Sequence, residues 1–246
     1  TPDGQWAFFH FQHHHALGRV VHLQPMHWEN DWPVIGVDFD RNGIGEPVYV
    51  CQKPIESKTI FAPQTDDDFS TPNLSLQWQF NHNPVNTHWS LNERRGWLAL
   101  KALKAATLRE SRNMLTQKCM GYLSTATVLL DFSALADGQR GGLFCTGSLY
   151  NGIGISREEG KNYLYLEKNG DVQQVKMVSG KKIYLRVMLD AKKNRCQLFY
   201  SFDNRNFILC GDAYSLKFGD WKGARVGLYS YNTLGIGGKC YFDSFN

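Results

Sequence analysis

The stretch Lys182–Phe202, KIYLRVMLDAKKNRCQLFYSF, carries the pattern that decides the fold. Apolar and polar residues alternate along Lys182–Leu189 and again along Cys196–Phe202, and the polar residues Lys192–Arg195 stand between them. Successive side chains of a β-strand point to opposite faces, so an alternation with a period of two is typical of a strand that buries one face. The stretch therefore predicts two antiparallel strands joined by a tight turn.

Similar segments recur outside this stretch. The Asn169-Gly170 pair predicts a second hairpin, because both residues accept the positive φ of a type I′ turn, and Asp203–Asn206 is another turn candidate. Only Ala105–Arg112 suggests a helix, which we expect to be a short insertion. The further alternating segments are Leu74–Phe80, Trp97–Leu103, Thr125–Phe132, Asn162–Lys168, Ala224–Tyr231 and Lys239–Phe245. Short strands at this spacing predict an all-β fold, an antiparallel β-sandwich or barrel.

The first sixty residues differ in composition from the rest. Gly4–Gln12, Arg19–Asn30 and Trp32–Asp40 are also strand-like, but they are richer in His and Trp. Gln52–Asp68 has two prolines, an acidic run and no period, which is typical of a linker. We therefore place a boundary near Ala62, with domains 1–62 and 63–246. Three or four strands are too few to bury a core alone, so the first segment should pack on the sandwich or end something larger.

Composition narrows the class of protein. The 246 residues are 42% hydrophobic and 20% charged, with a net charge of +4 and no Lys/Arg block. This argues against nucleic acid as a partner. No apolar run approaches the roughly 20 residues of a membrane helix, and the opening TPDGQWAFF lacks a signal-peptide pattern, although a processed start would look the same. None of the six cysteines forms a C-x-x-C pair, so we expect buried free thiols, with one disulfide as the alternative.

Two stretches resemble a known family. HFQHHHALGRVVHLQPMHWENDWPVIGVDFDRNGIGEPV (His10–Val48) resembles the closing part of the five-bladed β-propeller of glycoside hydrolase family 43, which includes β-xylosidases and α-L-arabinofuranosidases. LSLQWQFNHNPVNTHWSL (Leu74–Leu91) resembles the opening of the concanavalin-A-like sandwich that follows this propeller, and Gly147–Ile155 and Tyr241–Phe245 fit the same sandwich. The resemblance implies an antiparallel concanavalin-A-like sandwich preceded by a few strands of an incomplete propeller.

The resemblance also implies a function and its limits. Family members hydrolyse glycosidic bonds with inversion, using an Asp base, a Glu acid and a second Asp, all in earlier blades. The chain is thus expected to be the C-terminal portion of a glycosidase acting on plant cell-wall pentose glycans, with no catalytic residue of its own. The carboxylates that match none of the three are Asp3, Glu29, Asp31, Asp38, Asp40 and Glu46.

The implied partners are the missing propeller blades and a plant cell-wall oligosaccharide or polysaccharide. The implied location is periplasmic or extracellular, because wall glycans stay outside the cell until they are cut. Two alternatives remain open: a non-catalytic carbohydrate-binding sandwich, and a purely structural accessory domain.

Candidate substrate-binding residues follow from the resemblance. Arg19 matches an arginine that the family places in the sugar pocket, although a structural arginine is the alternative and Leu17 stands where relatives often have an aromatic residue. His13 and His14 belong to a run that replaces an acidic, Gly-containing turn, and we expect them at the pocket rim. Adjacent side chains diverge on a strand, which makes the run a poor zinc site.

Two further candidates come from residue types and spacing. Trp78 and Trp89 would form a sugar-stacking platform if both rings were exposed, whereas packing in the core is the commoner role. Asp38, Asp40 and Asn42 have the D-x-D-x-N-G spacing of a calcium loop, but Tyr49 stands at the twelfth position where that loop needs Glu. A turn stabilised by Asx side chains is the favoured interpretation, with a calcium contact as the alternative.

Overall fold

The computed structural model describes residues 1–216, 221–235 and 237–246 and divides into two compact units. The first unit contains Thr1–His14 and Arg19–Pro63, and the second contains His15–Gly18 and Gln64–Asn246. The change between residues 63 and 64 lies next to the boundary expected near Ala62. The short segment His15–Gly18 groups with the second unit, which no feature of the sequence indicated. No helix among the described residues is long and apolar enough to cross a membrane.

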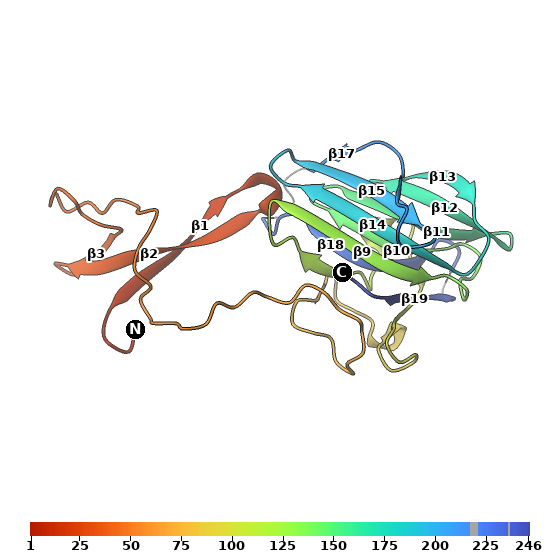
Figure 1. Ribbon diagram of the computed structural model, residues 1–246, viewed down its shortest axis with the longest axis horizontal. Helices are drawn as coiled ribbons and strands as arrows, with labels where there is room; N and C mark the ends of the chain where they lie inside the picture. Colours follow the sequence, from red (N-terminus) through yellow and green to blue (C-terminus); the bar gives the residue numbers. More distant parts are fainter. Residues whose placement is uncertain (217–220, 236) are drawn as a thin grey trace. The chain divides into compact units, whose positions relative to one another are not determined.

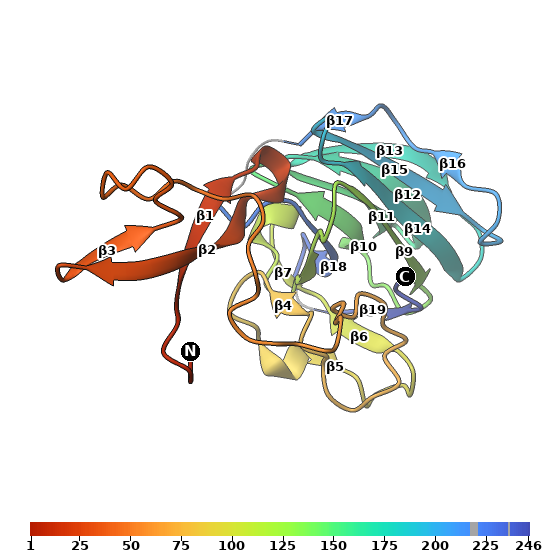
Figure 2. The same cartoon turned by 60° about the vertical axis from the view of Figure 1, so that its left-hand side comes forward.

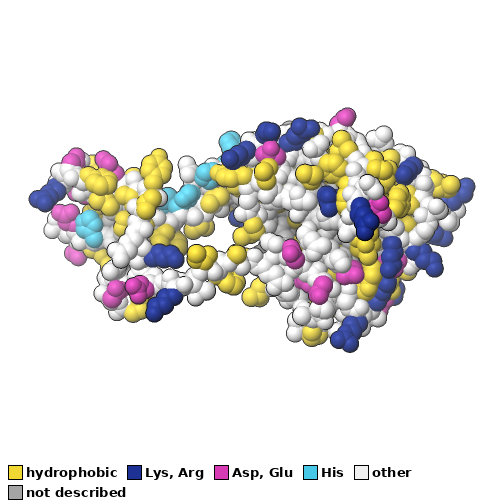
Figure 3. Space-filling view, in the orientation of Figure 1, with side chains coloured by type: hydrophobic (Ala, Val, Ile, Leu, Met, Phe, Trp, Pro, Cys, Tyr) yellow, Lys and Arg dark blue, Asp and Glu magenta, His cyan; other side chains and the backbone are white. Residues whose placement is uncertain are grey.

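The first unit is a three-stranded antiparallel sheet (Figure 1). Its strands are β1 (Trp6–His13), β2 (Arg19–Glu29) and β3 (Trp32–Ile35). The first two match the predicted strands to within two residues, whereas β3 ends at Ile35 and not at the predicted Asp40. Asn30 and Asp31 turn the chain between β2 and β3 at positive φ. Of its residues, only Gln24, Val34 and Gly36 are buried. Large apolar side chains such as those of Phe9 and Trp32 are more than 70% exposed, and Figure 3 shows hydrophobic groups over its surface.

The second unit is a sandwich of two antiparallel sheets, seen from two sides in Figures 1 and 2. The β10 sheet runs in the order β13 (Asp171–Met177), β12 (Lys161–Lys168), β11 (Tyr150–Glu158), β10 (Gln139–Thr146), β18 (Arg225–Asn232), β8 (Leu115–Lys118) and β4 (Gln79–Phe80), with β7 (Leu103–Lys104) parallel to β18. The β14 sheet runs in the order β16 (Ile208–Leu209), β15 (Arg195–Ser201), β14 (Lys182–Asp190), β9 (Leu123–Asp131), β19 (Lys239–Asp243), β6 (Leu98–Lys101) and β5 (Trp89–Ser90), with β17 (Tyr214–Ser215) beside β15. The expected antiparallel sandwich is confirmed.

The core lies between the two sheets. In β14 the buried positions are every second residue, Ile183, Leu185, Val187 and Leu189, as the alternation of Lys182–Leu189 predicted. Burying one such side chain stabilises the fold by about 1.5–3 kcal/mol, so the sum over the core dominates folding. Fully buried residues of the facing sheet complete the core: Leu143, Ile153, Ile155, Leu164 and Leu228.

A smaller apolar cluster covers part of the outer face of the β10 sheet, the face turned away from β14. Tyr165, Tyr229 and Tyr231 stand on this face and contact Leu108 and Met114 from the segment 105–114. That segment differs from the expected helix at Ala105–Arg112, because only Leu108–Glu110 forms a single 3-10 turn, η3. Its role is to place Leu108 over the sheet, with no exposed surface left on that side chain.

Two hairpin turns are confirmed in detail. Asn169 and Gly170 connect β12 to β13 with φ values of 51° and 98°, which a type I′ turn requires. Asp203 closes the turn after β15 by accepting hydrogen bonds from the backbone N–H groups of Arg205 and Asn206. These bonds hold the pKa of the Asp203 carboxyl well below its ordinary value.

Candidate functional site

The β1–β2 hairpin positions the predicted arginine. Arg19 opens β2 directly opposite His13, the last residue of β1. Directly opposed residues of two antiparallel strands point to the same face of the sheet, and so do residues two apart along one strand. Arg19, His13 and Phe11 therefore lie on one face of the hairpin. The Arg19 guanidinium carbon is 4.4 Å from the centre of the Phe11 ring, a cation–π contact that restrains an otherwise exposed side chain.

The opposite face of the same hairpin carries a column of imidazoles. His10 opposes His22 in the register, with ring centres 5.4 Å apart, and His14 lies 5.9 Å from His22. The Nε2 atom of His14 is 3.1 Å from Oε1 of Gln12. His13 therefore shares a face with Arg19, whereas His14, one residue past the end of β1, lies beside His22 on the other face. Among the described residues no group of three or more His, Cys, Asp or Glu is arranged to hold a metal ion.

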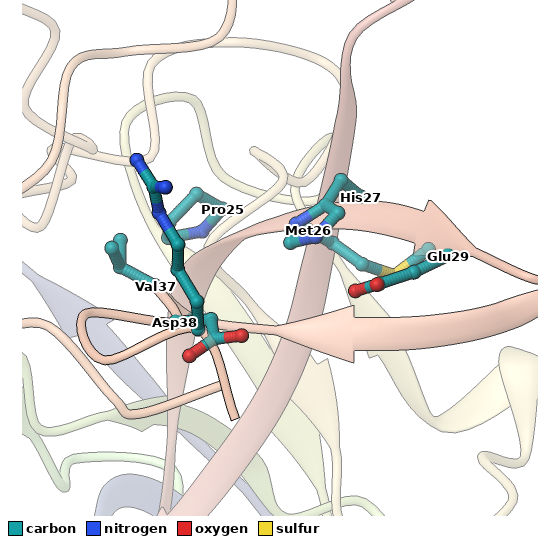
Figure 4. A pocket seen from close by; sticks show the side chains of 8 residues that line it. Pro25, Met26, His27, Glu29, Val37 and Asp38 are labelled. Carbon is teal, nitrogen blue, oxygen red and sulfur yellow. The ribbon is translucent and has the colours of Figure 1, made fainter. Parts of the chain in front are cut away.

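A pocket of about 580 Å³ lies between β2 and the segment that follows β3 (Figure 4). His27 and Glu29 reach it from β2, and Asp38 and Arg41 come from the loop. Its volume suits a small ligand, and its mixed charges offer both donors and acceptors. We assign it no catalytic role, however, because neither Glu29 nor Asp38 matches a catalytic carboxylate of the family that the sequence resembles.

The proposed calcium residues form a closed turn. Both carboxylate oxygens of Asp38 accept backbone N–H groups, Oδ1 from Asn42 at 3.1 Å and Oδ2 from Gly43 at 2.9 Å. Asp40 accepts from the Asn42 side chain at 3.0 Å. Partial desolvation raises the pKa of Asp38, but the bonds from Gly43 and Asn42 outweigh it and leave that pKa below its ordinary value. This geometry is that of an Asx-stabilised turn.

The expected tryptophan platform is not formed. Trp78 is 7% exposed, its ring packs against Phe69 and Phe245, and its Nε1–H donates to Oδ2 of Asp67 at 2.8 Å. A ring covered in this way has no free face for a sugar, so we correct its assignment to a core residue. Trp89 is half-buried and packs on Phe80, with centres 5.3 Å apart.

The structure also assembles a polar network that the sequence analysis missed. The carboxylate of Glu167, fully buried, accepts from the Tyr231 hydroxyl at 2.6 Å and from the backbone N–H of Leu108 at 2.7 Å. Beside it the hydroxyls of Tyr165 and Tyr229 are 2.6 Å apart. Burial raises the pKa of both phenols. The alternation of β12 and β18 was the signal available, because it places these residues on the outer face.

Comparison with known proteins agrees with this architecture. Residues 66–246 match the family model described as the beta xylosidase C-terminal concanavalin A-like domain. A putative beta-xylosidase of Xylanibacter ruminicola is 46% identical over 92% of this chain and 42% of its own length. A beta-xylosidase of Formosa agariphila is 37% identical over all of this chain and 46% of its own length. A bifunctional GH43-CE structure from Bacteroides eggerthii superposes with a TM-score of 0.82 and 29% identity, covering 100% of this chain and 33% of that one.

The fold defines a protein of the concanavalin A-like sandwich class, joined to a short antiparallel sheet. The chain belongs to glycoside hydrolase family 43, and its residues 66–246 are the C-terminal concanavalin A-like domain of the β-xylosidase type. It spans less than half the length of the curated relatives that it matches.

Proposed function

We propose that this chain is the C-terminal part of an inverting pentosidase that cleaves xylosides or arabinofuranosides of plant cell walls. The observation that carries the proposal is the first unit, a sheet of three strands that exposes most of its aromatic side chains. Such a sheet is marginal alone in water, and it gains a core once further blades cover it. The family membership reported above supports blades of the propeller type as that cover.

In this proposal the active-site residues come from two parts of the protein, the preceding blades and this chain. The Asp base and the Glu acid come from the preceding blades, and this chain contributes Arg19, whose planar guanidinium can donate two parallel hydrogen bonds to sugar oxygens. His13 lies beside Arg19 on the same face and is the second candidate for the pocket rim. The sandwich supports the propeller. We place the enzyme in the periplasm or outside the cell, where wall glycans are found, and cell fractionation tests that location.

Hydrolysis of p-nitrophenyl glycosides tests the proposal. The chain alone should release no p-nitrophenol from the β-xyloside or the α-L-arabinofuranoside, and supplying the preceding blades should restore release. In the restored enzyme, Arg19→Met should raise KM or lower kcat at least tenfold, whereas the exposed Arg95→Met should leave both unchanged. Turnover by the chain alone would place the catalytic carboxylates within residues 1–246 and overturn the proposal.

A further inference from the structure

The uncovered end of the outer face of the β10 sheet carries a row of polar and aromatic residues. The register pairs Tyr231 with Arg140, Arg140 with Ser156, and Ser156 with Tyr163, across strands β18, β10, β11 and β12. Directly opposed residues share a face, so these four side chains stand in line on the outer face. Tyr231 is buried beneath the segment 105–114, whereas Arg140 and Tyr163 are only half-buried.

A pocket of about 230 Å³ opens at this row. Arg140 and Ser156 line it from the sheet, Glu158 lines it from the end of β11, and Asp137 and Leu234 line it from neighbouring loops. The pocket is smaller than the 300–1,000 Å³ that is usual for drug-sized ligands, so it fits about one small ring. Leu234 is 73% exposed and gives the pocket an apolar wall.

The hydroxyl of Ser156 is the unusual feature of this pocket. Ser156 is 1% exposed, and its Oγ atom has no hydrogen-bond partner among the residues that the structure describes. A buried hydroxyl without a partner costs about 1–3 kcal/mol, and folded proteins rarely keep one without a reason. Arg140 stands directly beside Ser156 in the register, and both residues line the same pocket.

Three carboxylates, those of Asp137, Glu158 and Glu159, line the pocket together with the guanidinium of Arg140. Arg140 donates to the Tyr231 hydroxyl at 3.3 Å, and Nε of Arg157 lies 3.5 Å from Asp137. The carboxylate of Glu158 accepts from the side chain of Gln174 at 2.7 Å. No described group here could hold a metal ion. The excess of carboxylates disfavours an anion, and the lining offers donors and acceptors to a neutral ligand rich in hydroxyls.

We propose that this pocket binds one ring of a neutral saccharide, with the Ser156 hydroxyl and the Arg140 guanidinium as its hydrogen-bonding groups. Glu158 accepts from sugar hydroxyls at the mouth, and Leu234 covers the apolar face of the ring. The proposal places a carbohydrate-binding site on the sandwich, away from Trp78. It rests on the proposed function only in the choice of xylose-based and arabinose-based oligosaccharides for the first titration.

Titration of the 246-residue chain with xylo-oligosaccharides and arabino-oligosaccharides, followed by amide chemical shifts, tests the proposal. Saturable shifts should appear at Arg140, Ser156 and Leu234. Ser156→Ala should weaken binding at least tenfold while the midpoint of thermal unfolding stays the same or rises, because the variant removes an unpaired buried hydroxyl. Ser124→Ala, on β9 of the other sheet, is the matched control and should bind like the parent chain.

A second variant distinguishes a loss of binding from a loss of folding. Leu234→Asp changes a largely exposed side chain, so it should fold normally and still lose binding. The absence of saturable shifts with both sugar series, or unchanged affinity in the folded Ser156→Ala and Leu234→Asp variants, would overturn the proposal. Hydrolysis by the restored enzyme is measured separately. Saccharide binding at this pocket together with no hydrolysis by the restored enzyme would reject only the proposed function. Hydrolysis by the restored enzyme together with no saccharide binding at this pocket would reject only the binding site.

Discussion

Gly18 and Gly223 pass each other with their backbones in contact. A β-carbon on Gly18 would collide with the backbone nitrogen of Gly223, and one on Gly223 would lie 2.5 Å from the carbonyl carbon of Leu17. Both glycines have positive φ, at 74° and 80°. The adjacent backbone N–H of Ala224 donates to the carbonyl of Ala16, whose side chain is 1% exposed within the sandwich core. This close approach explains why His15–Gly18 groups with the second unit.

Replacing either glycine should therefore destabilise the sandwich. Gly18→Ala and Gly223→Ala should each lower the free energy of unfolding by about 2–4 kcal/mol, through backbone strain and overpacking together. Urea denaturation measures the change. Gly235→Ala is the control, because its β-carbon would meet open space and its φ is not positive, and it should stay within about 0.5 kcal/mol of the parent. Equal effects at all three positions would contradict the close approach.

Trp78 should behave as a core residue. Trp78→Ala should cost about 3–5 kcal/mol of stability, because it opens a cavity against Phe69 and Phe245. Trp78→Phe keeps an aromatic ring but loses the bond to Asp67, so we expect a smaller cost of about 1–2 kcal/mol. Thermal unfolding ranks the two. A folded Trp78→Ala variant of parent-like stability would restore the stacking platform as an interpretation.

The buried carboxylate of Glu167 should hold the segment 105–114 on the sheet. Tyr231→Phe removes the hydroxyl donor and leaves the Leu108 N–H, and it should lower the free energy of unfolding by about 1–3 kcal/mol. Hydrogen exchange at the Leu108 amide should quicken in this variant more than exchange in β14. The half-buried Tyr163→Phe, on the same face, is the control and should change neither quantity. Unaltered exchange at Leu108 in Tyr231→Phe would show that the segment is held by packing alone.

Asp131 should contribute to loss of stability in acid. Burial raises the pKa of its carboxyl, but the Arg94 guanidinium at 2.8 Å and the Ser133 hydroxyl outweigh burial and leave that pKa below its ordinary value of 3.8. A carboxyl with a lowered folded pKa stabilises the protein above that ordinary value, and the contribution is lost as pH falls through the folded pKa. Asp131→Asn should therefore be less stable at pH 7 and show a flatter loss of stability below pH 4.

Denaturant midpoints from pH 7 to pH 2.5 measure this dependence. Asp171→Asn is the control, because Asp171 is exposed at the start of β13, and its curve should follow that of the parent chain. Parallel curves for Asp131→Asn and the parent chain would contradict the assignment.

One thiol of the six should react in the native state. Cys51 is exposed, whereas the other five are buried. Burial raises the pKa of Cys119 and of Cys240 to about 12, which suppresses the reactive thiolate at neutral pH. A disulfide-exchange reagent should therefore label one equivalent in buffer and six in guanidinium chloride, and Cys51→Ser should abolish the native labelling. Fewer than six in denaturant would indicate a disulfide.

The calcium alternative has a direct test as well. Since Asp38 already accepts two backbone N–H groups, we expect 1 mM calcium chloride to leave the midpoint of thermal unfolding unchanged. Asp38→Ala should loosen the turn whether or not the ion is present. A calcium-dependent rise that disappears in Asp38→Ala would establish a metal contact at this loop.

Alternation alone located most strands of the sandwich. β9, β12, β14, β15, β18 and β19 match the alternating segments to within a few residues, because each buries at least one face. It missed β10 and β11, whose glycines at positions 141, 142, 152 and 154 interrupt the apolar pattern, and β13, which is exposed along its whole length. It also overextended Leu74–Phe80, of which only Gln79–Phe80 is a strand.

The sequence by itself determined the all-β class and the two hairpin turns, because these follow from local periodicity and turn chemistry. Tertiary structure decided which residues are available to a ligand. It buried Trp78 under Phe69 and Phe245, parted His13 from His14, and brought Ser156 into the lining of a pocket. The physical reason is that the burial of a side chain depends on which other segments of the chain pack over it. The type of the residue alone does not reveal which segments those are.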